Sequence, residues 1–143
     1  MGPFSNGRHT LESAHAVAVL DYHMVFAVAS RHGVFGSESG PVIAEDWRRH
    51  ESDGKFALLK VSFVPDHIHL AVRMHPAAVP EELAAFLMNR AQERMLRDFP
   101  EHLITAGVQR LWPGSAYAGS YGDITAGHVL GYMRKWEAAV AQG

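Results

Sequence analysis

Apolar side chains recur at every second position through residues 14–29, a period that is typical of a β-strand. The other side of this strand is more mixed. One face carries Ala16, Ala18, Leu20, Tyr22, Met24, Phe26 and Val28, and the other carries His15, Val17, Val19, Asp21, His23 and Val25. A strand of this length usually bends or extends beyond its own sheet. We therefore expect the strand of residues 14–29 either to bend or to extend beyond its own sheet.

Two further strands form a predicted hairpin. Residues 56–64 are rich in apolar residues, and residues 67–73 follow after the short turn Pro65-Asp66. Residues 115–121 predict a short fourth strand, which contains Tyr117.

Helical patterns separate these strands. Residues 41–50 predict a short helix with Pro41 in its first turn. Residues 80–99 predict the longest helix, because apolar residues follow one another at spacings of three and four. This core stripe consists of Ala84, Met88, Ala91, Met95 and Phe99. Pro100 is expected to end the helix, residues 102–114 to be irregular with Leu111-Trp112 as an anchor, and residues 125–140 to form a last helix.

The element order predicts the fold class. A β-α-β-β-α-β-α order is typical of an α+β protein with a ferredoxin-like (RRM-like) antiparallel sheet and helices on one face, here followed by a C-terminal helix that carries Tyr132. Residues 1–13 are polar and without periodicity, so we expect a flexible N-terminal tail before a single domain of residues 14–143.

The segment His67-Ile68-His69 carries the clearest chemical signal. In a strand, the side chains of His67 and His69 point to the same face while Ile68 points to the other. Their Cα atoms then lie roughly 6.6 Å apart, two strand rises, so both imidazoles can reach one metal ion. The alternative is a pair of histidines with hydrogen-bond partners on a half-exposed strand, and the three residues by themselves leave both possibilities open.

Composition narrows the function classes. The 143 residues are 48% hydrophobic and 20% charged, as in an ordinary globular domain, and no apolar run approaches the roughly 20 residues that a membrane span needs. The absence of cysteine excludes disulfides and thiolate zinc sites. A net charge of −2 argues against a protein that coats duplex DNA through charge alone. Since no signal peptide is recognisable, we expect a cytoplasmic protein without a membrane partner.

Three arginines lie together on the long predicted helix, on the side opposite its core stripe. They are Arg90, Arg94 and Arg97. Such a face either is solvated or contacts the phosphates of a nucleic acid, and the pattern does not decide between the two.

Taken together, these segments resemble a known family, the HUH single-tyrosine transposases of the insertion-sequence 200/605 group, often called TnpA. The matching segments appear in the family's order and cover roughly residues 14–137. They are Asp21-Tyr22-His23-Met24-Val25-Phe26, Arg31 with Val34-Phe35, Val64-Pro65-Asp66-His67-Ile68-His69-Leu70, Leu111-Trp112-Pro113-Gly114-Ser115-Ala116-Tyr117 and Val129-Leu130-Gly131-Tyr132-Met133.

The resemblance implies a function and a set of roles. His67 and His69 would be metal ligands, Tyr132 the catalytic nucleophile, and Arg31 a DNA-binding residue. Members of the family are metal-dependent single-stranded DNA endonucleases and strand transferases that act on hairpin-containing element ends through a 5′-phosphotyrosine. They work as homodimers whose active sites are shared between the two chains. Magnesium or manganese would be the cofactor, and imidazole ligands favour manganese.

Two positions depart from the family pattern. Trp136 stands where the family has a glutamine ligand one helical turn after the tyrosine, and Ala29-Ser30 replace a basic pair before Arg31. The alternative function is therefore a domesticated relative that binds DNA hairpins with weak or no cutting, and a more distant one is a small metal-binding domain with an unrelated substrate.

The missing glutamine raises the question of a third ligand. His128 lies one helical turn before Tyr132, so both would share a helix face. His128 would then be a substitute metal ligand, with an exposed first-turn residue as the alternative. Trp136 on the same face would stack on an unpaired DNA base.

Overall fold

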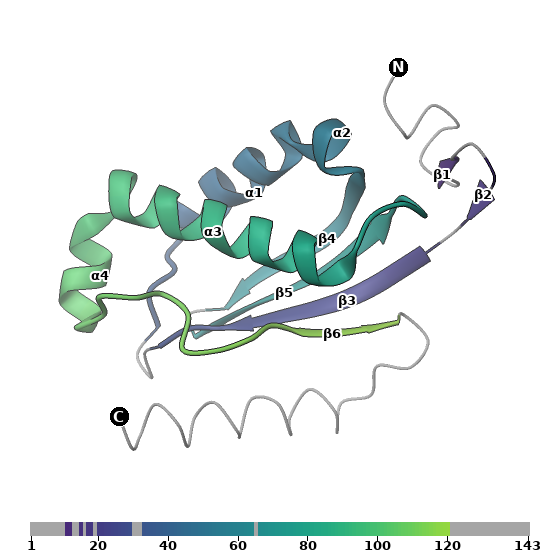
Figure 1. The fold of residues 1–143 in the computed structure, drawn as a ribbon. Helices are drawn as coiled ribbons and strands as arrows, with labels where there is room; N and C mark the ends of the chain where they lie inside the picture. Colours follow the sequence, from purple (N-terminus) through teal and green to yellow (C-terminus); the bar gives the residue numbers. More distant parts are fainter. Residues whose placement is uncertain are drawn as a thin grey trace.

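A four-stranded antiparallel sheet with helices on one face forms the body of the protein (Figure 1). The computed structural model describes residues 11–12, 15, 17–18, 20–29, 33–64 and 66–120. The strand order is β4-β5-β3-β6, and each neighbouring pair is antiparallel. The strands are β3 (Leu20–Ala27), β4 (Phe56–Val64), β5 (His67–Met74) and β6 (Tyr117–Ser120). This arrangement confirms the α+β fold class.

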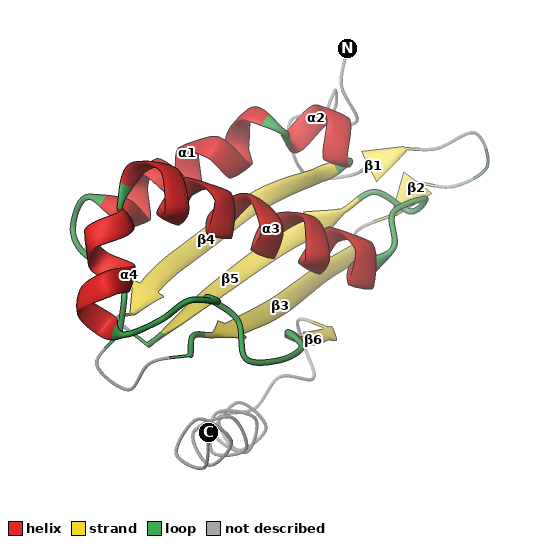
Figure 2. Cartoon of the chain, turned by 60° about the vertical axis from the view of Figure 1, so that its left-hand side comes forward, coloured by secondary structure: helices red, strands yellow, loops and turns green. Residues whose placement is uncertain are grey.

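The helices form a single layer over this sheet (Figure 2). The two long ones pack against each other, and α1 also contacts β4. They are α1 (Ser39–Arg49) and α3 (Pro80–Asp98), with the short helices α2 (Glu51–Gly54) and α4 (Pro100–Ala106) following them in the chain. The opposite face of the sheet therefore receives no helix from the described part of the chain.

The long N-terminal strand extends beyond the main sheet, one of the two expected outcomes. Its first part is β2 (Val17–Ala18), which pairs with β1 (Leu11–Glu12) in a separate two-stranded sheet. Only β3 joins the main sheet. The predicted tail thus overlaps a paired strand at residues 11–12, while residues 1–10 lie outside the described residues.

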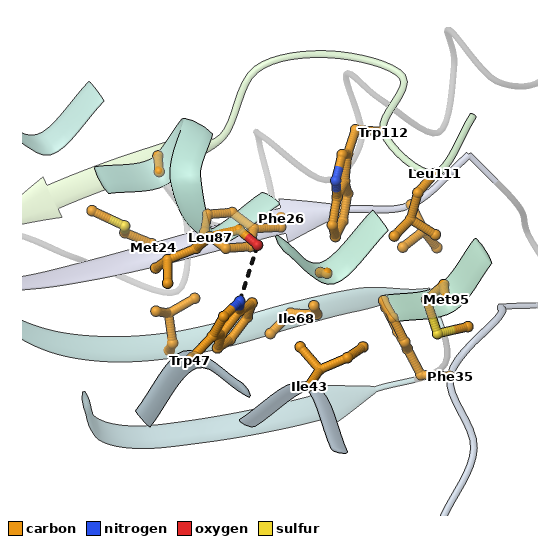
Figure 3. Packing of buried hydrophobic residues seen from close by; sticks show 14 of the residues in the cluster. Met24, Phe26, Phe35, Ile43, Trp47, Ile68, Leu87, Met95, Leu111 and Trp112 are labelled. Carbon is orange, nitrogen blue, oxygen red and sulfur yellow. Dashed lines mark hydrogen bonds between the residues drawn. The ribbon is translucent and has the colours of Figure 1, made fainter. Parts of the chain in front are cut away.

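The core lies between the sheet and the helices (Figure 3). Met24 and Phe26 of β3 meet Ile68 of β5 there, and all three are fully buried. Two tryptophans hold α3 in place, because each indole N–H donates to a backbone carbonyl of this helix. Trp47 Nε1 donates to Leu87 O at 3.0 Å, and Trp112 Nε1 donates to Met88 O at 2.9 Å. The expected anchor role of Leu111-Trp112 is confirmed.

One predicted boundary is wrong. Pro100 does end α3, but residues 100–106 form helix α4 instead of beginning an irregular stretch. Proline lacks an N–H and has a fixed φ near −65°, which suits the first position of a new helix as well as the end of an old one. The helix ends at Gly107, whose φ of +70° gives the left-handed cap that glycine adopts readily.

A β-bulge interrupts β4 at Leu59. Leu58 pairs with Val72 of β5 and Lys60 with the adjacent Ala71, so Leu59 has no partner in the ladder. The extra residue resets the alternation of β4. Phe56, Leu58, Val61 and Phe63 consequently face the helices, and Lys60 and Ser62 face the other side.

No helix in the part of the chain that the structure describes is long and apolar enough to cross a membrane.

Candidate functional site on the histidine face

The sheet face that points away from the helices carries the two predicted metal ligands. Strand alternation places His67 and His69 on this face, whereas Ile68 is fully buried and Leu70 nearly so on the helix side. The shared direction of the two imidazoles is as predicted. We call this side the histidine face, and the register of the strands adds Asp21, His23, Val25, Lys60, Ser62, Arg73 and Tyr117 to it.

His67 is held by its sequence neighbour. Its Nδ1 lies 2.9 Å from Oδ1 of Asp66, and the two side chains are 23% and 40% exposed, respectively. A carboxylate accepts, so Nδ1 of His67 carries the proton and Nε2 keeps its lone pair when the ring is neutral. A metal-binding histidine commonly donates its other ring N–H to a carboxylate in this way. The contact therefore suits His67 for binding a cation through Nε2.

His69 is held by a second histidine, His23 of β3. Nε2 of His69 lies 2.9 Å from Nδ1 of His23, and the ring centroids are 5.0 Å apart. Burial is the main cause that lowers the pKa of both imidazoles. The positive charge of Lys60 lowers the pKa of both further, and His23 and His67 add to the effect on His69. Both rings are therefore biased towards the neutral form, which is the form that binds metals.

The arginine of the histidine face has a partner within the fold. Arg73 donates from Nε and Nη2 to both carboxylate oxygens of Asp21, at 2.7 and 2.9 Å. These hydrogen bonds raise the pKa of Arg73, against a smaller lowering by burial. The forked geometry is the strong form of the arginine–carboxylate pair. Arg73 thus ties β5 to β3 beside the histidines.

Two of the three arginines predicted on the long helix are also engaged, but in the helix layer. Asp46 of α1 is 1% exposed, and it accepts from Nε and Nη2 of Arg90 at 2.9 and 2.7 Å and from Nε of Arg94 at 2.6 Å. The hydrogen bonds to Asp46 are the main cause that raises the pKa of Arg90. A buried carboxylate with two arginines joins α1 to α3. The structure therefore gives Arg90 and Arg94 a partner inside the protein.

Arg97 differs from the other two. Its side chain is 65% exposed, and its described contact is with Asp98, the last residue of α3. All three arginines lie on the helix side of the sheet, opposite to His67 and His69. Their contact with DNA stays a prediction, and Arg97 is the member of the set with the most exposed side chain.

The remaining predicted site residues lie outside the described residues. These are Arg31, His128, Tyr132 and Trp136. Within the described ranges, no three histidine, cysteine, aspartate or glutamate side chains converge on a common point. His67 and His69 thus stay a predicted pair of ligands.

Comparison with known proteins identifies the family. Residues 16–135 match the family model of the IS200-like transposases, and this covers most of the chain. The chain is also 24% identical over 106 residues to the ISDra2 transposase TnpA of Deinococcus radiodurans, across 74% of this chain and 72% of that relative. The chain belongs to the IS200-like transposase family. It is therefore a DNA-processing protein of the tyrosine transposase type.

Solved structures support the same fold. A crystal structure of a Deinococcus radiodurans R1 protein assigned as a transposase superposes with a TM-score of 0.76 and 22% identity, covering 87% of this chain and 96% of the other. A REP-associated tyrosine transposase, solved bound to a REP hairpin, superposes with a TM-score of 0.52 and 7% identity, covering 85% and 68%. At these identities the two matches establish the fold alone.

Three residues of the site were not predicted to have a role there. Asp66 and His23 each contact one of the two predicted ligands, and the positive charge of Lys60 lowers the pKa of His69. For His23 and Lys60, only the strand register reveals this proximity. The sequence did hold one signal for His23. It lies on the same side of its strand as Asp21 and Val25, opposite Met24 and Phe26, which belong to the core cluster between the sheet and the helices.

Proposed function

We propose that this chain cuts and rejoins single-stranded DNA through a phosphotyrosine at Tyr132, with a divalent cation held by His67 and His69. One observation carries the proposal: in a chain of this family, both imidazoles lie on one sheet face, each is fixed by a hydrogen-bond partner, and burial lowers the pKa of His69. Two imidazole nitrogens suit Mn²⁺ as ligands better than Mg²⁺, because Mg²⁺ prefers oxygen ligands.

Each group has a defined part in this chemistry. The cation, when bound, would withdraw charge from the scissile phosphate and orient it for in-line attack. The Tyr132 oxygen loses its proton and bonds to phosphorus, while the 3′-oxygen leaves and takes up a proton. The product is a 5′-phosphotyrosine and a free 3′-hydroxyl. A later 3′-hydroxyl can reverse the step without a nucleotide cofactor, because the phosphodiester energy is retained in the bond to tyrosine.

A covalent-adduct assay tests this proposal. The protein is incubated with Mn²⁺ and single-stranded DNA from the flanks of its own gene, and protein–DNA species are resolved on a denaturing gel. We expect an adduct with the unmodified chain, none with Tyr132→Phe, and a loss of at least about 100-fold with His67→Ala. Tyr117→Phe is the matched control, because Tyr117 is a tyrosine on the histidine face. Adduct with Tyr132→Phe but not with Tyr117→Phe would show that the wrong tyrosine had been chosen.

The proposed substrate is a DNA end that contains a hairpin, and the proposed assembly is a homodimer with shared active sites. The REP-associated neighbour was solved with a hairpin, which supports the substrate class. Mixing His67→Ala chains with Tyr132→Phe chains tests the sharing. A site built from the histidines of one chain and the tyrosine of its partner is restored in the mixed dimer, whereas a site within one chain is not. No adduct in the mixture would exclude sharing.

A second function is favoured by Trp136, which replaces the expected glutamine ligand. In this alternative the chain binds hairpin DNA and no longer cuts it. Hairpin binding without any adduct, in Mn²⁺ and in Mg²⁺, would select it. The related prediction that His128 substitutes as the third ligand is tested by the Mn²⁺ affinity of His128→Ala, which should fall about 10-fold or more if His128 binds the metal.

A further inference from the structure

The contact between His23 and His69 links two strands. In the register of β3 with β5, His23 lies opposite Ala71 and is therefore diagonal to His69. The two rings reach each other across this diagonal, with Nδ1 of His23 2.9 Å from Nε2 of His69. Since β3 is paired on both sides, with β5 and β6, the backbone beneath His23 is fixed by the sheet itself.

This hydrogen bond restricts how His69 can bind a cation. A neutral imidazole has one N–H and one lone pair, and a cation needs the lone pair. If Nε2 of His69 donates to His23, its Nδ1 keeps the lone pair. If Nδ1 of His23 donates instead, His69 carries its proton on Nδ1 and has no lone pair left for a metal. Only the first direction is compatible with His69 as a ligand while the contact persists.

We propose that His23 is a positioning residue of the metal site: it accepts a hydrogen bond from Nε2–H of His69 and thereby presents Nδ1 of His69 to the cation. The inference rests on the metal site of the proposed function and adds a residue to it. Asp66 acts on His67 with the opposite result, because it occupies Nδ1 and leaves Nε2. The two ligands would therefore bind through different ring nitrogens, Nε2 of His67 and Nδ1 of His69.

The first test needs no metal and no variant. Nitrogen-15 NMR of the metal-free protein reports which ring nitrogen of each histidine is protonated. We expect His69 as the Nε2–H tautomer, with this proton protected from exchange and hydrogen-bonded to Nδ1 of His23. His69 as the Nδ1–H tautomer would overturn the inference and leave the roles of Tyr132 and His67 untouched.

The second test uses Zn²⁺ as a diamagnetic probe of ligation and affinity. His23→Leu should lower Zn²⁺ affinity about 10–100-fold, the usual effect of losing an outer partner of a ligand. His23→Asn should stay within a few-fold of the unmodified protein, because its amide oxygen can accept where Nδ1 stood. His102→Leu is the matched control on α4 and should leave affinity unchanged.

The outcomes separate the inference from the proposed function. Ligation of Zn²⁺ by Nε2 of His69 in the unmodified protein overturns the inference alone. Equal affinity of His23→Leu and the unmodified chain does the same. If no chain binds Zn²⁺ or Mn²⁺, the unmodified one included, the metal site of the proposed function falls and the inference falls with it.

Discussion

The two faces of the sheet treat their polar side chains in different ways. In the helix layer, Asp46 is buried and its two oxygens are taken up by Arg90 and Arg94. On the histidine face, His67 and His69 each use one ring nitrogen for a protein partner, and the chemistry of the ring leaves the second nitrogen for another. The first cluster is closed by its hydrogen bonds, and the second retains binding capacity.

This difference teaches how to weigh clusters of titratable groups. The arginine cluster was a candidate DNA surface by sequence, yet its most buried members stabilise the contact between α1 and α3. His67 and His69 are hydrogen-bonded as well, but a histidine has two separate ring nitrogens, and a protein partner at one of them fixes the other for a ligand. The number of unused donor or acceptor atoms separates a structural cluster from a candidate site.

Loss of both arginines from Asp46 should have the largest effect. Arg90→Ala with Arg94→Ala leaves a buried carboxylate without its cations, and we expect a loss of about 3–5 kcal/mol in the free energy of unfolding. Urea denaturation followed by circular dichroism measures it. Arg48→Ala with Arg49→Ala is the control, because it removes the same charge from exposed positions of α1 and should cost under about 1 kcal/mol. Adding Asp46→Asn to the first pair should restore part of the loss, and no restoration would show that the buried charge is not the cause.

Neighbouring residues of β5 should separate stability from binding. Ile68→Ala removes a fully buried side chain and should cost about 2–5 kcal/mol. His69→Ala loses one hydrogen bond and should cost only about 0.5–1.5 kcal/mol. Isothermal titration with Mn²⁺ should show the reverse order, with binding lost in His69→Ala and kept in folded Ile68→Ala. Equal Mn²⁺ affinity in both variants would contradict the assignment of the histidine face.

Asp66 should affect metal affinity more than folding. Asp66→Ala frees Nδ1 of His67, so the ring can turn, and we expect Mn²⁺ affinity to fall about 10-fold. The free energy of unfolding should change by less than about 1 kcal/mol, because Asp66 is 40% exposed. Asp66→Asn retains an acceptor and should recover most of the affinity. Asp53→Ala, an exposed carboxylate of α2, serves as the control and should leave affinity unchanged.

Arg97 should give the smallest effect. Arg97→Ala removes an exposed side chain and should change the free energy of unfolding by no more than about 0.5 kcal/mol. If Arg97 contacts a phosphate, the slope of log affinity against log salt for hairpin DNA should decrease by about 1. Fluorescence anisotropy at several salt concentrations measures this slope. Arg110→Ala is a matched exposed arginine, and an unchanged slope in Arg97→Ala would remove Arg97 from the predicted DNA contacts.

Local periodicity allowed much of the fold to be predicted. The hairpin of β4 and β5 and the long helix α3 follow from alternation and from three- and four-residue spacings. Helix α4 was missed, because Pro100 was interpreted only as the end of α3 and not also as a favourable first residue of the next helix. The local sequence is compatible with proline in either role, so only the packing of residues 100–106 could show that a new helix begins there.

The site was less accessible to sequence, because its contacts are distant along the chain. The direction of His67 and His69 follows from two residues in one strand. The pairing of His23 with His69 depends on the register of β3 with β5 across 46 residues. Asp46 likewise lies 44 residues from Arg90, so the arginines alone could not reveal their buried partner.

The bulge at Leu59 bears on how relatives are to be compared with this chain. One inserted residue is absorbed at the bulge, so the positions beyond it keep their faces: Ser62 stays beside His69, and Phe63 stays opposite Ile68 in the core. A relative with a regular β4 would need a one-residue gap at position 59 in its alignment. Without that gap, every later position of the strand would be compared with its neighbour from the other face, and the chemistry of the histidine face would be assigned to core residues.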